Sequence, residues 1–520
     1  MPHRPVLPHF STALPHFPPA RKTAVETEAA EPAPPRVSAV VVGGGISGLI
    51  AARDLALSGL AVTLFEAGTE LGGCVGTHQV AGLTLDSGAE SFATRSRAVP
   101  ELIEELGLGD AVVAPVPGGA WLQLAGDDLP SAAQRMPQTG LLGIPADPRA
   151  PEIVQAIGRT AAARAALDKV LPVGSLARRE TVSLGEVVRA RMGEVVLRRL
   201  VAPVVGGVYS SDPDVLDVDS VAPGLRAALA KHGSLAAAVA SMRASAPAGS
   251  AVAGLSGGMG MLTRALEKEL VALGVNLRTG TPVAAVERRS GGGWLVAPAA
   301  ADPTAGATVS ADVLVTATDG PSAVDLLAGS VPELAAARPG PGPGVALVTL
   351  VVDQPDLDAH PRGTGILVAA DAEGVDAKAL THATAKWQWL ADSTGPGTHV
   401  LRLSYGRALS AADAAAASRP SAVDRKDDDL FAQALADASA LLQVPLGVDD
   451  VVGWDVVRWV GALPSAAVGH RDRVASVRAA VEKVPGLEVV GAWLAGTGLA
   501  AVTADTRTRM TRLLEQLDRV

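Results

Sequence analysis

Residues Val40–Gly48, with the sequence VVVGGGISG, decide the fold. The three valines predict a short buried strand, and the apolar segment through Ile50 and Leu55 predicts a helix that ends near Gly59. The glycines between them follow the spacing Gly-x-Gly-x-x-Gly, which permits a tight turn and lets a pyrophosphate approach the backbone at the helix N-terminus. With Ala61–Phe65 as the next strand, the segment predicts a βαβ unit, the start of a doubly wound α/β sheet that binds a dinucleotide.

The residues after this second strand distinguish between dinucleotides. Glu66 ends the strand at the position where a carboxylate binds the ribose hydroxyls, and it disfavours a 2′-phosphate. Leu71-Gly72-Gly73 follows and resembles the second glycine turn of glutathione-reductase-type flavoproteins, in their amine oxidase and protoporphyrinogen oxidase branch. That branch usually has Arg or Lys after the glycine pair, where this chain has Cys74. The resemblance implies FAD as the cofactor.

Composition excludes several classes of protein. The net charge of −10 and the lack of a Lys/Arg-rich run disfavour a nucleic-acid partner. The single cysteine, Cys74, excludes an intrachain disulfide, a Cys-based zinc site and an iron–sulfur cluster, so we expect no metal and an organic redox cofactor. Two uncharged apolar stretches, Val37–Ala52 and Val489–Ala504, are shorter than the ~20 residues of a spanning helix. We therefore expect a cytoplasmic protein for which membrane contact is not required, and no pattern indicates an oligomeric state.

Further motifs resemble the porphyrinogen oxidases over roughly residues 37–515. They occur in the family's order along the chain: Asp86–Phe92 beside the flavin, Gly206–Tyr209, Gly257–Leu262 before a helix, Thr281-Pro282-Val283 near the adenine, Thr316–Asp319 at a strand end, Lys386-Trp387, Arg458-Trp459 with Ala462-Leu463-Pro464, Val468-Gly469-His470, and Gly496–Leu499 at the last glycine turn. The resemblance implies a cofactor site made of Gly43, Gly44, Gly45, Ile46, Ser47, Gly48, Glu66, Ala67, Gly73, Cys74, Gly88, Ala89, Glu90, Ser91, Val283, Trp459, Thr497, Gly498 and Leu499.

The resemblance also implies how the chain is divided. We expect a discontinuous FAD-binding domain at residues 37–95, 250–335 and 453–520, a mainly helical region at 96–249 and a substrate-binding region of sheet and helix at 336–452. Residues 1–36 are rich in proline and are expected to be a disordered extension. Ser183 and Glu186 form a capping-box pattern before a helix with apolar positions at Val187, Val188, Met192, Val195 and Val196.

The activity implied is a six-electron oxidation of a porphyrinogen, a colourless tetrapyrrole, in haem biosynthesis. Flavin N5 accepts hydride, dioxygen reoxidises the flavin and hydrogen peroxide is released; no catalytic acid or base is assigned. The composition, rich in Ala and Gly and poor in Lys, indicates a GC-rich bacterial genome. A GC-rich composition points toward Gram-positive actinobacteria. In these bacteria the family member usually oxidises coproporphyrinogen III to coproporphyrin III, and protoporphyrinogen IX is the alternative substrate.

Porphyrinogens carry propionate carboxylates, which suit arginine side chains. Arg95 and Arg97 follow the flavin-side segment and are the first candidates to bind them, with Lys386 and Arg458 as weaker ones. Ordinary surface cations are the competing interpretation for all four.

Other classes remain open. An amine oxidase would flank the flavin with aromatic residues, but the chain has only Tyr209 and Tyr405 as tyrosines and Leu494 in the late turn. A carotenoid desaturase would have a C-terminal glycine-proline turn that is absent here. A nonenzymatic dinucleotide-binding module would lack flavin colour, and the nine histidines are scattered along the chain, which does not support a hydrolase.

Overall fold

The structure, a computed structural model, describes residues 37–125, 133–137, 140–174, 176, 179–244, 251–299, 307–340, 342–406, 421–461 and 466–519. Val37–Val520 forms one compact unit. The predicted extension at 1–36 and the motif residues Ala462, Leu463 and Pro464 lie outside the described residues. Within the described ranges, no helix combines the length and the apolar character needed to cross a membrane.

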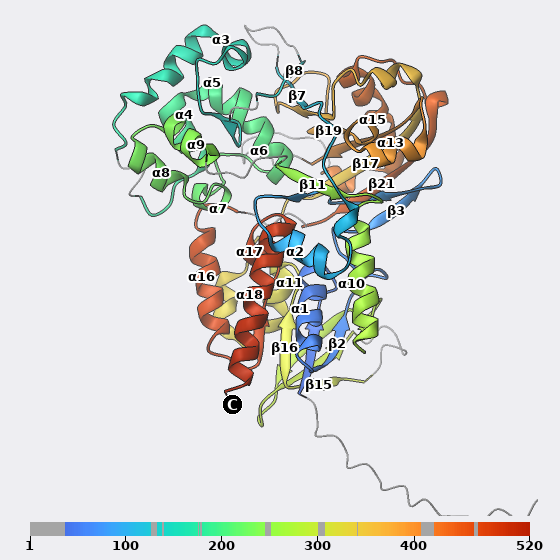
Figure 1. Cartoon of the computed structure of the whole chain (residues 1–520). Helices are drawn as coiled ribbons and strands as arrows, with labels where there is room; N and C mark the ends of the chain where they lie inside the picture. The colour runs from blue at the N-terminus through green and yellow to red at the C-terminus, as the bar shows by residue number, and fades with distance from the viewer. Residues whose placement is uncertain are drawn as a thin grey trace, which may run out of the picture. The chain divides into compact units, whose positions relative to one another are not determined.

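A five-stranded parallel sheet contains the predicted βαβ unit (Figure 1). Its strand order is β12 (Asn276–Arg278), β2 (Ala61–Phe65), β1 (Ser38–Val42), β16 (Val313–Thr316) and β22 (Leu487–Val489). Val40 pairs with Thr63 on one side and with Leu314 on the other, so β1 lies in the middle and is buried on both faces. This placement explains why its sequence is a continuous run of valines.

Different layers cover the two faces of this sheet. Ala39 and Val41 pack toward the helices α1 (Ile46–Leu57), α10 (Gly260–Ala272) and α18 (Leu499–Leu517). Val40 and Val42 face the opposite way, toward a three-stranded antiparallel sheet of β13 (Val283–Arg288), β14 (Trp294–Pro298) and β15 (Val309–Ala311), and toward α11 (Gly320–Leu327) and α16 (His470–Val481). The helix predicted after the first glycine turn, with its end near Gly59, is confirmed as α1, which ends at Leu57.

A seven-stranded mixed sheet forms the second large layer. Its order is β21 (Val451–Trp459), β17 (Val345–Asp353), β20 (Thr398–Tyr405), β19 (Ala379–His382), β18 (Gly365–Val368), β7 (Ala120–Gln123) and β8 (Ala133–Arg135), with only β18 and β7 parallel. One face packs against α15 (Asp427–Leu442) through alternate residues such as Ala346 and Leu403. Because β21 pairs with β17, residues 453–459 belong to this sheet, although the predicted domain boundary at 453 would separate them from it.

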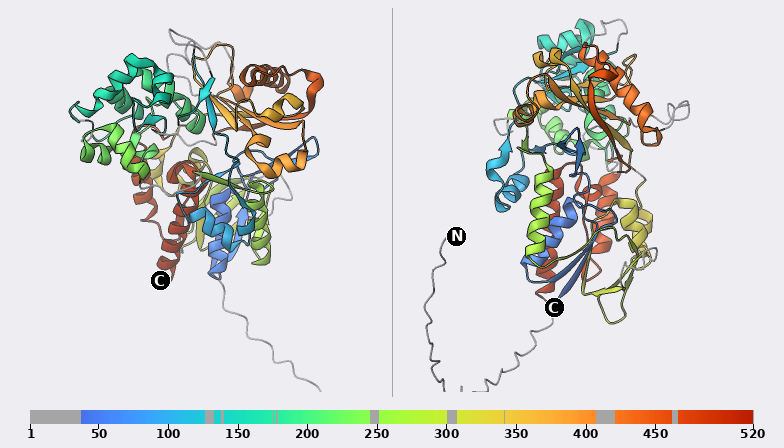
Figure 2. Two further views of the ribbon diagram at one scale, coloured as in Figure 1. Left: turned by 45° about the horizontal axis from the view of Figure 1, so that its top comes forward. Right: turned by 90° about the vertical axis from the view of Figure 1, so that its right-hand side faces the viewer.

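Residues 151–244 form a helical region with its own core. It contains α3 (Pro151–Ala166), α4 (Leu184–Met192), α6 (Ala202–Tyr209), α8 (Leu225–His232) and α9 (Leu235–Ala244), seen apart from the parallel sheet in Figure 2. The Ser183 hydroxyl accepts from the Glu186 N–H, which confirms it as the N-cap of α4. The predicted helix does not continue to Val196, because Gly193 (φ 95°) ends it. Val195 lies in the separate short helix α5 (Glu194–Val196) and is 37% exposed.

Candidate active site

The first glycine loop has the geometry of a phosphate-binding turn. Gly43 has φ 106°, and a Cβ placed on Gly48 would lie 1.8 Å from the Gly43 carbonyl oxygen, so the turn can close only with glycine there. A Cβ on Gly45 would meet no atom within 4 Å. The backbone at Gly45 is therefore open toward a ligand, and the N-terminus of α1 follows directly.

Glu66 connects the end of β2 to this loop. Its carboxylate accepts from the Gly44 N–H at 2.6 Å and from the Gly68 N–H at 2.7 Å. A carboxylate has further acceptor sites, so the same side chain can still bind ribose hydroxyls. The second glycine turn packs on the first, because the Gly72 N–H donates to the Gly44 carbonyl at 2.8 Å.

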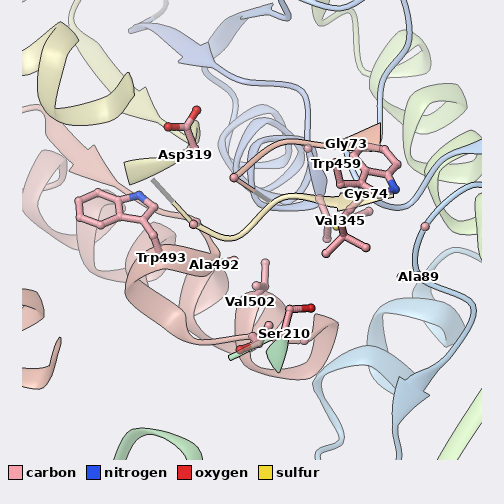
Figure 3. A pocket seen from close by; sticks show the side chains of 18 of the residues that line it. Gly73, Cys74, Ala89, Ser210, Asp319, Val345, Trp459, Ala492, Trp493 and Val502 are labelled. Carbon is pink, nitrogen blue, oxygen red and sulfur yellow. The ribbon is translucent and has the colours of Figure 1, made fainter. Parts of the chain in front are cut away.

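A cavity of about 620 Å³ begins at these two turns (Figure 3). Many of the sequence-predicted cofactor residues line it: Gly45, Ile46, Ser47, Gly73, Cys74, Gly88, Ala89, Trp459, Thr497, Gly498 and Leu499. Segments from both ends and the middle of the chain therefore meet at one cavity. In Figure 3, Trp459 and Cys74 lie at one end of the view and Trp493 and Asp319 at the other.

The remaining predicted cofactor residues do not form the cavity wall. Gly43, Gly44 and Gly48 shape the turn behind it, and Glu66 contacts that turn. Ala67 is exposed, while Ser91 and Val283 are half-buried. The Thr281 N–H donates to the Glu66 carbonyl at 2.8 Å, which places the strand that begins at Val283 beside Glu66.

The flavin-side segment predicted at Asp86–Phe92 is fixed by contacts with distant residues. The Ala89 N–H donates to the Cys74 carbonyl at 2.8 Å, and the Trp459 indole N–H donates to the Ser87 carbonyl at 2.9 Å. Cys74 is open to the cavity, but the surrounding protein desolvates it and raises the pKa of its thiol. The thiol is therefore in its neutral form near pH 7, and the position carries no positive charge.

An ion cluster behind this wall was not predicted from the sequence. Glu90 pairs with Lys386 and with Arg402, whose guanidinium also donates to the Gly88 carbonyl at 2.8 Å. Burial alone would raise the pKa of Glu90, but the charges of Lys386 and Arg402 outweigh it and lower this pKa to about 2. The alternation of Leu401, Arg402 and Leu403 on β20 was the available signal, since a polar residue between core residues faces the other side of a strand.

The four predicted substrate cations occupy different environments. Lys386 pairs with Glu90, and Arg458 donates to the Val423 and Arg425 carbonyls and pairs with Asp427. Arg458 precedes Trp459 on β21 and so faces away from the cavity.

Arg95 and Arg97 are both exposed. Arg97 pairs with Glu101 at 3.0 Å, and its side chain is 74% exposed. The pKa of Tyr209 is raised by burial, and the positive charge of Arg95 opposes this shift, which places Arg95 close to the end of α6. That end reaches the cavity, because Gly207, Val208 and Ser210 line it.

Among the residues that the structure describes, three other cations line the cavity instead: Lys378, Arg402 and Arg473. One carboxylate, that of Asp319, is among the lining residues, and it accepts from the Ser322 N–H at the start of α11. His470 also contributes to the wall, and burial lowers the pKa of its imidazole. The described part of the chain holds no group of three or more His, Cys, Asp or Glu side chains arranged for a metal ion.

The chemistry of the wall fits a dinucleotide. The turn at Gly45 leaves open space at the N-terminus of α1, where the first backbone N–H groups have no partner within the helix, and the described lining residues include more cations than carboxylates. Trp493 lines the cavity, and its buried indole N–H has no hydrogen-bond partner among the described residues. A ligand with an acceptor at this position would satisfy that donor.

The chain belongs to the family of flavin containing amine oxidoreductases, whose model matches residues 46–504. Membership implies a flavin cofactor and an oxidoreductase activity. Coproporphyrinogen III oxidase of Mycobacterium leprae (strain TN) is 33% identical to it, covering 89% of this chain and 94% of that protein. The enzyme of the same name from Bacillus subtilis (strain 168) is 27% identical over 88% of this chain and 94% of its own.

Solved structures agree with this assignment. The structure named as a protoporphyrinogen oxidase from Exiguobacterium sp. 255-15 has 28% sequence identity and a TM-score of 0.76, covering 93% of this chain and 99% of that one. A putrescine oxidase at 16% identity has a TM-score of 0.59, covering 94% of this chain, and therefore shares the fold alone. The mixed α/β fold predicted from Val40–Gly48 and the predicted family are confirmed.

Proposed function

We propose that this protein is an FAD-dependent oxidase that converts coproporphyrinogen III to coproporphyrin III. One observation carries the proposal: a single cavity is lined both by the glycine turns and by cationic side chains that include Lys378, Arg402 and Arg473. The glycine turns suit a dinucleotide, and the cationic side chains suit a ligand with several carboxylates. The relatives named coproporphyrinogen III oxidase match about nine-tenths of the chain, which favours this substrate over protoporphyrinogen IX.

FAD is the flavin that the site supports best. The Gly-x-Gly-x-x-Gly turn at the N-terminus of α1 would bind the pyrophosphate, and Glu66 would bind the ribose hydroxyls. Both features are expected of a doubly wound, glutathione-reductase-like domain. The parallel sheet with helices on one face and an antiparallel sheet on the other supports that description.

The bound cofactor would accept two electrons in each of three cycles and return them to dioxygen as hydrogen peroxide. The chain itself would bind and orient the cofactor and the substrate, and it would keep water away from them. Trp459 and Arg402 hold the carbonyls of Ser87 and Gly88, which fixes the segment that would lie beside the flavin. His470 stays neutral near pH 7 because burial lowers its pKa, and we assign no catalytic base.

Growth of porphyrin fluorescence under air tests the proposal directly. Purified protein with an absorbance band near 450 nm would be mixed with coproporphyrinogen III or with protoporphyrinogen IX, and peroxide would be measured in parallel. We expect faster porphyrin formation from coproporphyrinogen III, with about three peroxides per porphyrin, since each two-electron cycle reduces one dioxygen. No increase with either substrate would overturn the proposal, whereas peroxide release with a simple amine would support an amine oxidase.

A further inference from the structure

The motif Val468-Gly469-His470 leads into α16 beside the helical region (Figure 1). The Asp217 N–H donates to the Ala466 carbonyl at 2.8 Å, and the Val468 N–H donates to the Val215 carbonyl at 3.0 Å. The same helical region lines part of the cavity with the end of α6. The start of α16 therefore reaches the cavity on the side of the helical region.

The first turn of α16 presents one face to the cavity. His470, Arg473 and Val474 line the cavity, and residues three and four apart lie on the same side of a helix. Arg471 has a different environment, because its side chain is 67% exposed and pairs with Asp219 at 3.6 Å. The spacing therefore places one guanidinium and one imidazole on the same part of the cavity wall.

Arg473 is a half-buried cation of this wall. No described residue forms an ion pair or a side-chain hydrogen bond with its guanidinium. Arg402 differs in this respect, because Glu90 balances its charge. A half-buried charge loses part of its hydration, and only a counter-ion or a hydrogen-bond acceptor offsets that loss. The N–H donors of Arg473 are therefore available to an anion in the cavity.

His470 adds a buried donor on the same face of the helix. It is 8% exposed, and its imidazole has no hydrogen-bond partner within the described part of the chain. Burial lowers the pKa of His470 and the charge of Arg473 lowers it further, so the ring is neutral near pH 7 and carries one N–H. The charge of Asp217 acts in the opposite direction, but that carboxylate already accepts from the Ser220 N–H at 2.9 Å. Because buried polar groups are almost always hydrogen-bonded, the unpaired imidazole indicates a ligand at this position.

The surroundings of these two side chains also favour an anion. The N-terminus of the 12-residue helix α16 carries a partial positive charge. Asp472 in its first turn is exposed, and Asp319, a carboxylate of the cavity lining, accepts from the Ser322 N–H at the start of α11. The pyrophosphate of FAD has its own expected site at the N-terminus of α1. The start of α16 is therefore available to a second anionic group, such as a carboxylate of the substrate.

We infer that Arg473, with His470 as a second donor, binds one carboxylate of the tetrapyrrole substrate. This inference rests on the proposed function, because it identifies which residues select a ligand with peripheral carboxylates. A guanidinium suits this role, since charge-assisted bonds to a carboxylate are about twice as strong as neutral hydrogen bonds. Neither residue is among the four cations selected from the sequence.

The experiment compares two porphyrins that differ only in their carboxylates. Coproporphyrin III and its tetramethyl ester would be titrated into the FAD-loaded protein in the same detergent, and dissociation constants would be taken from fluorescence. In Arg473→Met, we expect about 10- to 100-fold weaker binding of the free acid, the range for loss of a charged hydrogen bond, and no change for the ester. Arg473→Lys should lose less, since the charge remains. Arg471→Met is the matched control on the same helix and should equal the wild type.

Several outcomes overturn the inference. Unchanged affinity of Arg473→Met for the free acid removes the residue from the substrate site. An equal loss for acid and ester indicates a change of shape rather than a lost carboxylate contact, and a loss of the 450 nm band places Arg473 in the cofactor site. If Arg473→Met does not fold, His470→Phe provides the test, because it keeps an aromatic ring and removes the donor. We expect a several-fold loss for the acid alone, and an unchanged affinity would overturn the inference.

The proposed function fails separately from the inference. A wild-type protein that oxidises no porphyrinogen overturns the proposed function. A wild-type protein that oxidises coproporphyrinogen III, with Arg473→Met equal to it in Kd and KM, overturns only the carboxylate site.

Discussion

The two walls of the central cavity are built in different ways. The wall at Gly45 and Gly73 consists mainly of backbone, and its shape depends on turns that close only with glycine. The rest of the lining includes side chains, among them Lys378, Arg402 and Arg473, that come from separate elements. A backbone wall requires a fixed local spacing of residues, whereas a side-chain wall requires only that distant strands and helices meet. The first kind of site is visible in a sequence and the second is not.

The largest effect that we expect comes from the backbone wall. In Gly48→Ala, the new methyl group would lie 1.8 Å from the Gly43 carbonyl oxygen, and a backbone atom cannot rotate away. We expect no folded FAD-containing protein, as judged by circular dichroism and by absorbance near 450 nm. Gly45→Ala meets no protein atom, so it should fold but lose cofactor, because the methyl group enters the ligand space.

Gly109→Ala is the matched control for both variants, since it has open space and no positive φ. A Gly48→Ala protein with normal colour would show that the backbone wall tolerates side chains. The contrast between the two walls would then be wrong.

A second prediction concerns the ion cluster that joins the walls. Glu90→Gln leaves Lys386 and Arg402 facing each other without a carboxylate, and removal of one partner from a buried ion pair costs about 3–5 kcal/mol. Because the side chains keep 14–17% exposure, we expect the lower end of that range in urea unfolding. Arg402→Lys should lower the free energy of unfolding less than Arg402→Met does, since the positive charge remains.

The same cluster predicts a pH dependence. The pKa of Glu90 is lowered from 4.5 to about 2 in the folded protein, so its stabilising contribution is present above pH 4.5 and is lost as the pH falls toward 2. The free energy of unfolding, measured with urea between pH 3 and pH 6, should change less with pH in Glu90→Gln than in the wild type. Equal slopes would show that the ion cluster does not control this part of the pH profile.

A smaller effect is expected where the side-chain wall is supported from behind. The buried Asp437 carboxylate accepts from the Ala377 N–H at 2.8 Å and from the Tyr405 hydroxyl at 3.1 Å. Asp437→Ala should lower the free energy of unfolding by about 1–3 kcal/mol, because it leaves buried donors unsatisfied. It should also raise the KM for the porphyrinogen, since Ala377 precedes Lys378, while FAD content stays normal.

Glu267→Ala, on the exposed side of α10, is the control for loss of a carboxylate. If Asp437→Ala lost FAD and substrate affinity together, the two walls would not be independent.

The smallest effects are expected at the two arginines that follow the flavin-side segment. Arg97 forms a surface pair with Glu101, and such pairs contribute about 0–1 kcal/mol. Arg97→Ala should therefore leave both KM and stability nearly unchanged. Arg95 lies near Tyr209 at the cavity end of α6, so Arg95→Ala should raise KM several-fold, as measured by porphyrin fluorescence. If Arg97→Ala raised KM more than Arg95→Ala did, Arg97 would belong to the substrate site.

Much of the fold was predictable because its signals are local. The strands at Ser38–Val42 and Ala61–Phe65 and the helix from Ile46 follow directly from hydrophobic pattern and glycine position. The end of α4 was predicted wrongly, because Gly193 ends the helix although the apolar pattern continues to Val196. The boundary at 453 could not be found locally, since β21 belongs to the seven-stranded sheet only through its pairing with β17.

The candidate site also contains residues that the sequence indicates locally and residues that only the tertiary structure brings together. Arg458 and Trp459 are neighbours in the sequence, yet only Trp459 lines the cavity, because successive residues of a strand face opposite sides. Lys378 and Ser210 are far apart in the sequence, and nothing in either segment indicates that they are hydrogen-bonded. The ion cluster of Glu90, Lys386 and Arg402 is equally non-local.

The sequence by itself determined the backbone wall, the likeness to a flavoprotein family and the order of its motifs. These features depend on conformations that only certain residues adopt, such as the turn at Gly43–Gly48. The tertiary structure alone decided which cations reach the cavity. A charged side chain has no intrinsic preference for a site, and its role depends on the strand face that carries it and on the carboxylates that neutralise it. For that reason Lys378, rather than Arg458, lines the cavity.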